Sequence, residues 1–209
     1  MSESDFGTRV REFGAWLYED ILDWCNGRSW EVRAILWLYT AWLGVAQFKD
    51  PQSWNALQSL NLPIHEGGHL LFRPFGELLH VAGGTFLQLA APTFSMFMFL
   101  KQRDYFAITF CFGWLSTNFV NISVYMQDAR ALALPLVSAE GGGGDGMIIH
   151  DWHWLFSKFG MLEHCEGIGL LVRMLGHALM LLSLSAGVWL FVQMQKSRSQ
   201  KPDSHHGSF

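Results

Sequence analysis

The sequence is poor in charged residues and in cysteine. Lys, Arg, Asp and Glu make up 15% of its 209 residues, whereas about a quarter of an ordinary soluble domain is charged. The 14 basic residues are outnumbered by 18 acidic ones and form no basic stripe, so nucleic acid is not an expected partner. The three cysteines lie far apart without a CxxC pair, which excludes a disulfide framework and a thiolate zinc cluster. They are Cys25, Cys111 and Cys165.

Apolar residues make up half of the chain and gather in long runs. A helix needs roughly 20 apolar residues to cross the hydrocarbon layer of a membrane. The pattern predicts an all-α, polytopic transmembrane helical bundle of about four spans, in one membrane-embedded domain over residues 32–194. The predicted spans are Val32 to Phe48, Leu79 to Leu100, Tyr105 to Met126 and Ile168 to Gln193.

The segments outside this domain are more polar. Residues 1–31 include an amphipathic helix over 8–24, expected either in the membrane interface or packed on the cytoplasmic end of the bundle. Its apolar positions are Val10, Phe13, Leu17, Ile21 and Trp24. The glycine run Gly141 to Gly146 lacks the Lys-Ser/Thr of a phosphate loop and indicates a hinge. Residues 195–209 are expected to form a disordered cytoplasmic tail.

The distribution of basic residues predicts the orientation in the membrane. With the N-terminus inside, nine Lys and Arg residues fall on the cytoplasmic side and four on the other. Because basic residues near span ends are retained in the cytoplasm, both termini are expected there. The expected location is the cytoplasmic membrane of a bacterium, with the lipid bilayer as a partner and an oligomeric state that the sequence leaves open.

The motif HEGGH carries the strongest chemical signal. On a helix, His65 and His69 project from one face and suit one zinc ion, while Glu66 stands where it can take a proton from a water. Pro63 and the Arg73-Pro74 pair predict a helix from Leu62 to Phe72, which at about 16 Å is too short to cross and is expected to be re-entrant. Without a metal, both histidines would instead bond to backbone and water.

A catalytic zinc needs a third protein ligand. The first choice is Asp128, at the end of the third predicted span; an ion pair with Arg130 or Arg73 is the alternative. The other possible metal or substrate contacts lie in the segment HDWHW, for which the alternative is an interfacial anchor through its tryptophans. They are His150, Asp151 and His153.

Two asparagines lie one turn apart on the same predicted span. Asn118 and Asn121 are expected either to orient an extended substrate and its oxyanion or to join helices by hydrogen bonds.

A membrane-embedded HExxH, followed after further spans by an aspartate in an Asn-rich segment, resembles the site-two protease family of intramembrane zinc metalloproteases. The resemblance covers residues 61–130, and Ala-Arg follows Asp128 where the family has Gly. It implies zinc held by His65, His69 and Asp128, with Glu66 as the catalytic base. The substrates implied are membrane-associated peptides. Two alternatives are a metalloenzyme acting on a lipid or small amphiphile, by hydrolysis or by oxidation at iron, manganese or copper, and a metal-binding or metal-sensing membrane protein.

Overall fold

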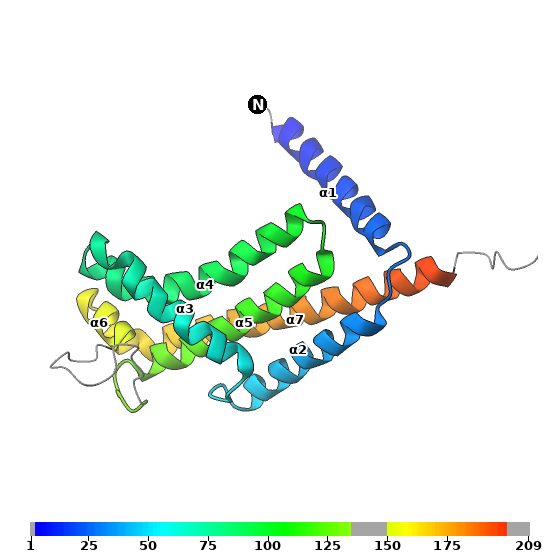
Figure 1. Ribbon diagram of the computed structural model, residues 1–209. Helices are drawn as coiled ribbons and strands as arrows, with labels where there is room; N and C mark the ends of the chain where they lie inside the picture. Colours follow the sequence, from blue (N-terminus) through cyan, green and yellow to red (C-terminus); the bar gives the residue numbers. More distant parts are fainter. Residues whose placement is uncertain (1–2, 135–149, 200–209) are drawn as a thin grey trace, which may run out of the picture.

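The computed structural model describes residues 3–134 and 150–199, and these ranges contain helices and no strand (Figure 1). The all-α prediction is therefore confirmed for the described residues. The helices are α1 (Glu3–Cys25), α2 (Glu31–Lys49), α3 (Ala56–Phe72), α4 (Glu77–Lys101), α5 (Tyr105–Asp128), α6 (Asp151–Lys158) and α7 (Cys165–Ser199). Two short 3-10 turns, η1 (Arg73–Phe75) and η2 (Leu162–His164), precede α4 and α7.

Helix α5 lies at the centre of the bundle. It packs along α7, and α2 and α4 pack against it as well. The four helices run side by side, while α3 lies across the bundle against α4 and the short α6 sits at the same end as the second half of α3 (Figure 1). The short turn from Lys101 to Tyr105 makes α4 and α5 antiparallel neighbours.

Three helical segments of the described chain are long and apolar enough to cross a membrane. They are Glu77–Lys101, Tyr105–Asp128 and Leu162–Ser199. These segments match the last three predicted spans. The first predicted span is helical, within α2, but α2 is not among the three; its tryptophans, tyrosine and glutamine make it less apolar.

The interior of the bundle contains polar side chains as well as apolar ones, and its exterior is rich in large apolar residues. Small polar side chains of α5 are buried, among them Ser116, Thr117 and Ser123, and Ser116 donates a hydrogen bond to the carbonyl of Gly176 on α7. Large apolar residues such as Phe94 and Leu181 face outward. Small polar residues between helices and apolar residues outside are the arrangement expected of a lipid-embedded bundle.

The segment near the N-terminus is helical, as expected, and forms α1, which extends away from the bundle (Figure 1). Its first half exposes Phe6 and Phe13, whereas Trp24 and Cys25 are buried against α7. Its place in the membrane interface stays a prediction. The glycine run lies outside the described residues, as does most of the expected tail; residues 195–199 are helical and belong to α7.

Helix α3 begins earlier than the sequence indicates. Asn55 caps it by accepting hydrogen bonds from Leu57 N and Gln58 N, and the side chain of Gln58 accepts one from Asn55 N. This capping box outweighs the start expected near Pro63, which lies inside the helix. The 17 residues of α3 span about 26 Å. Its end at Phe72 is as expected.

Candidate metal centre

The second half of α3 packs unusually close to α4. A Cβ added at Gly68 would lie 2.2 Å from the carbonyl oxygen of Gly83, and one added at Gly84 would lie 2.5 Å from Nε2 of His69 and 2.6 Å from Nε2 of His65. Only glycine leaves this room. Gly68 of HEGGH therefore packs against Gly83 and Gly84, and this close approach places the two imidazoles against the backbone of α4; a Cβ added at Gly67 would meet only Leu87 Cδ2, at 3.9 Å.

Three ligand atoms converge at this point. Nε2 of His65 lies 3.1 Å from Nε2 of His69, and Oδ2 of Asp151 lies 3.0 Å from the first and 3.3 Å from the second. Within the described residues, His65, His69 and Asp151 form the one group of this kind with geometry suited to a metal ion. Asp151, at the start of α6, thus joins the HEGGH histidines from a distant part of the sequence.

The three atoms fit a zinc ion in spacing and in chemistry. Zinc binds imidazole nitrogen and carboxylate oxygen at about 2.0–2.2 Å, and two ligands of a tetrahedral ion then lie about 3.3 Å apart. The observed edges of 3.0 to 3.3 Å agree with that triangle. Three protein ligands would leave a fourth position open, as catalytic zinc sites do.

The hydrogen bonds of the two Nδ1 atoms determine that the Nε2 atoms of His65 and His69 face the centre. Nδ1 of His69 lies 2.8 Å from the carbonyl oxygen of His80, which can only accept, so Nδ1 carries the hydrogen. Nδ1 of His65 lies 3.1 Å from Oε1 of Gln88. Both Nε2 atoms then point lone pairs at each other and at a carboxylate. A cation between these atoms would relieve the repulsion of their lone pairs.

A proton can serve as that cation when no metal is bound. Burial disfavours the charged imidazolium, but the hydrogen bond and charge of Asp151, with the His80 carbonyl, outweigh it and raise the pKa of His69 to about 9. Burial also opposes the charge on Asp151, yet hydrogen bonds from His65 and His69 hold the pKa of Asp151 below its usual value. The centre is therefore electrostatically prepared for positive charge.

His150 and His153 hold Asp151 in place from the HDWHW segment. Nδ1 of His150 accepts a hydrogen bond from His153 N and caps α6, and its ring stacks on Tyr125 with centroids 4.2 Å apart. Nδ1 of His153 donates to the carbonyl of Ala129, 2.7 Å away. Neither histidine belongs to the metal-ligating group, so the segment contributes one ligand and its supports.

Asp128, the third ligand expected from the sequence, does not lie with His65 and His69. Its carboxylate accepts hydrogen bonds from Ala133 N and Leu134 N, at 2.9 and 3.0 Å, and Oδ2 lies 3.5 Å from Nε2 of His150. It caps the turn that follows α5 instead. Among the described residues, Asp128 forms no ion pair with Arg130 or with Arg73, the alternative expected from the sequence, and Arg130 pairs with Glu163 and Glu166.

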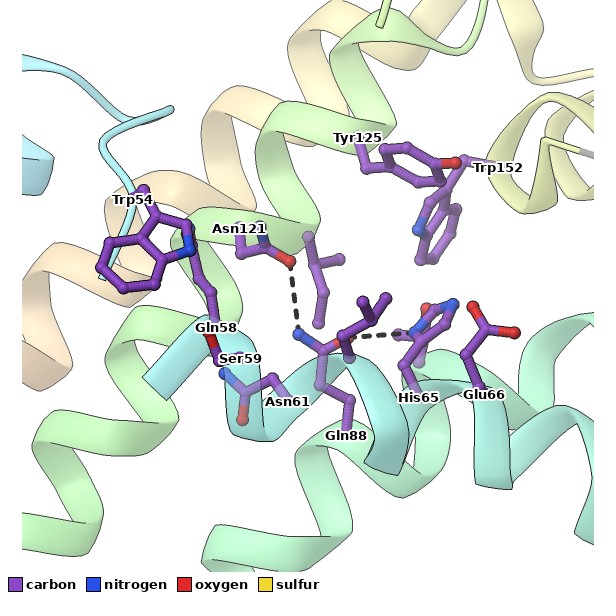
Figure 2. A pocket seen from close by; sticks show the side chains of 13 residues that line it. Trp54, Gln58, Ser59, Asn61, His65, Glu66, Gln88, Asn121, Tyr125 and Trp152 are labelled. Carbon is purple, nitrogen blue, oxygen red and sulfur yellow. Dashed lines mark hydrogen bonds between the residues drawn. The ribbon is translucent and has the colours of Figure 1, made fainter. Parts of the chain in front are cut away.

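A cavity of about 350 Å³ lies beside the centre, between α3, α4, α5 and α6. His65 and Glu66 form one end of its lining, Trp54 lies at the other, and Figure 2 shows the Glu66 carboxylate beside the His65 ring, with Tyr125 and Trp152 facing them. Glu66 is half-buried. A molecule in this cavity can therefore reach both the metal-ligating group and a carboxylate.

The two asparagines differ. Asn118 is fully buried and donates from Nδ2 to the backbone carbonyl of Gln88 at 2.7 Å, so it joins helices. Asn121 lines the cavity and accepts from Gln88 Nε2 at 3.3 Å. Gln88 and Gly84, which both lie against the histidines, are site residues that were not predicted from the sequence. In the sequence, Gly84 is marked only by its place in a Gly-Gly pair, and Gln88 only as a single glutamine within an apolar run.

No protein-family model, curated protein or solved structure matches the chain. The centre brings together two imidazoles, the carboxylate of Asp151, the nearby carboxylate of Glu66 and an adjoining cavity. Imidazole and carboxylate groups are the ligand types that zinc binds in proteins.

Proposed function

We propose that the protein is a membrane-embedded zinc metallohydrolase that cleaves peptide bonds of membrane-associated substrates. The observation that carries the proposal is the convergence of His65, His69 and Asp151 at the end of a cavity that Glu66 also lines. A histidine pair with one carboxylate is the ligand set of several zinc peptidases. Asp151 replaces Asp128 as the proposed third ligand.

Each residue then has a definite task. His65, His69 and Asp151 would hold the ion, which when bound supplies Lewis acidity toward a water and a carbonyl. Glu66 takes the proton from the attacking water and delivers it to the leaving amine nitrogen as the peptide bond breaks. The side chains of His65, His69 and Asp151 are only 18%, 16% and 10% exposed, so their charges are screened less than charges on an open surface.

The cavity favours a neutral substrate over an anionic headgroup. No Lys or Arg is among the described residues that line it, and its polar groups include the carboxamides of Gln58 and Asn121. Carboxamides pair with peptide N–H and C=O groups, whereas phosphate recognition relies on cationic side chains. At about 350 Å³, it is at the small end of ligand pockets, which suits a short peptide segment.

The topology that goes with this function has four spans. Helix α2 has 19 residues, about 28 Å, and packs beside α5 and α7, so we infer that it crosses with them. Helix α3 is then a re-entrant helix on the non-cytoplasmic side, and both termini are cytoplasmic. A reporter placed ahead of α2 and a fusion after Lys49 should report opposite sides of the membrane; the same side would refute a crossing by α2 and with it four spans.

Glu66→Gln tests the mechanism. Protein in liposomes with a library of single-span peptides should produce zinc-dependent cleavage, seen by mass spectrometry, and the variant should lose it. Its zinc content should match that of the wild type because Glu66 is not a ligand. His65→Ala is the matched control and should lose both zinc and cleavage. Full cleavage by Glu66→Gln would refute a hydrolytic role for this carboxylate.

A further inference from the structure

The His65 ring is held by a chain of buried carboxamides that reaches far from the metal centre. The chain links Trp114 and Asn118 on α5, Asn61 on α3 and Gln88 on α4; we call these four residues the amide chain. Asn61 and Gln88 are each 3% exposed and Asn118 is 0% exposed. Water therefore cannot rearrange these hydrogen bonds easily.

Trp114, the end of the amide chain farthest from His65, determines in which direction the hydrogen bonds of the chain are donated. The indole of Trp114 can only donate, and its Nε1 donates a hydrogen bond to Oδ1 of Asn61 at 2.7 Å. Asn61 must then present Nδ2 to its other neighbour, Oδ1 of Asn118, to which it donates. The carboxamide of Asn118 thus has its oxygen toward Asn61.

The backbone of α4 fixes the same direction independently. Nδ2 of Asn118 donates to the carbonyl oxygen of Gln88 at 2.7 Å, and a carbonyl can only accept. The two constraints on Asn118 agree, one from a pure donor and one from a pure acceptor. Its orientation is therefore determined by its partners.

The orientation of Asn118 in turn determines how the carboxamide of Gln88 faces His65. Its Nε2 donates toward Oδ1 of Asn118 at 3.5 Å and Oδ1 of Asn121 at 3.3 Å, which leaves Oε1 facing Nδ1 of His65 at 3.1 Å. An oxygen at this place requires a hydrogen on Nδ1. A reversed carboxamide would instead favour the hydrogen on Nε2, where it would block metal binding.

We propose that the amide chain is a positioning device that keeps His65 in the form with Nδ1 protonated and aims its Nε2 at the metal. The inference rests on the zinc site proposed above and assigns Gln88 as the positioning residue for one ligand. It also accounts for three carboxamides buried in a lipid-embedded bundle. Partners that orient ligating histidines typically contribute 10- to 100-fold in metal affinity.

Gln88→Met tests the proposal because methionine is of similar length and lacks the acceptor. Zinc affinity, measured by competition with a chromophoric chelator, should fall about 10- to 100-fold. Gln88→Glu keeps an acceptor toward His65 and should bind zinc at least tenfold more tightly than Gln88→Met. Gln47→Met is the matched control: Gln47 is also a buried helical glutamine, 1% exposed, and its carboxamide has no hydrogen-bond partner among the described residues. That control should keep wild-type affinity.

Unchanged affinity in Gln88→Met, an equal loss in Gln47→Met, or no recovery in Gln88→Glu would overturn the inference. Histidine ¹⁵N NMR of the unsubstituted protein, with the His65 signals assigned by their loss in His65→Ala, provides a test that needs no altered glutamine. Nδ1 of His65 should carry a hydrogen with or without zinc; an unprotonated Nδ1 would overturn the proposal. Wild-type protein that binds no zinc would defeat the proposed function, whereas the NMR result would still decide the role of the amide chain.

Discussion

His69 and His80 each donate a ring Nδ1–H to the backbone carbonyl of the other. The distances are 2.8 Å from His69 Nδ1 to His80 O and 2.9 Å from His80 Nδ1 to His69 O. This reciprocal pair ties the end of α3 to the start of α4. It also means that backbone orients His69, whereas a side chain, Gln88, orients His65.

Replacing His80 should therefore affect stability more than metal binding. His80→Leu removes one partly buried hydrogen bond but keeps the carbonyl that holds His69. We expect the free energy of unfolding in detergent to fall by about 1 kcal/mol and zinc affinity to fall less than in Gln88→Met. Denaturant titration and chelator competition measure the two effects. A loss of zinc affinity larger than that of Gln88→Met would contradict the backbone role.

Gly84→Ala should abolish zinc binding. The added Cβ would come within 2.5 and 2.6 Å of the two ligating Nε2 atoms, so the imidazoles must move apart. Gly167→Ala, at a helical glycine with nothing within 4 Å of its would-be Cβ, is the matched control and should bind zinc normally. Metal content after dialysis compares the two. Stoichiometric zinc in Gly84→Ala would show that the ion does not sit between these rings.

Two aspartates distinguish the ligand set of the structure from the one expected from sequence. Asp151→Ala should lose zinc, because it removes the one carboxylate ligand. Asp128→Ala should retain zinc and lose stability by about 1–3 kcal/mol, because Ala133 N and Leu134 N lose their acceptor. Zinc content and thermal unfolding of both variants provide the test. The reverse pattern would restore Asp128 as the ligand.

The features that could be predicted from the sequence are those that depend on the local pattern of residues. Apolar runs predicted the helices over Leu79 to Leu100 and Tyr105 to Met126, and the spacing of His65 and His69 placed both on one face. Composition also predicted that the cysteines are unpaired, and Cys25, Cys111 and Cys165 are all buried and free.

What the sequence leaves open depends on tertiary contact. The sequence does not show which of Asp128 and Asp151 lies beside His65 and His69. Only the packing of α6 against α4 brings Asp151 to these histidines. The start of α3 was misplaced because Pro63 is a strong local signal, while the capping box at Asn55 precedes it by two turns. Gln88 is a single polar residue in an apolar run, with no pattern to mark it.

The pH dependence of the metal-free protein should reveal the charge of the centre. Because the folded pKa of His69 is raised from 6.5 to about 9, its contribution to stability is full below pH 6.5 and is lost as the pH rises through about 9. The melting temperature with chelator should therefore fall across that window. Zinc affinity should rise over the same window, because the ion displaces the proton. In His69→Gln the melting temperature should lose this pH-dependent fall; a wild-type melting temperature that is flat or rises would contradict the pKa shift.

Zinc-edge X-ray absorption on purified, dialysed protein tests the central claim most directly. We expect about one zinc per chain with nitrogen and oxygen ligands at about 2.0–2.2 Å, including the multiple-scattering signature of two imidazoles. Asp151→Ala should lose the ion. A metal-free protein, or zinc surrounded by sulfur or by a single imidazole, would contradict a site built from His65, His69 and Asp151.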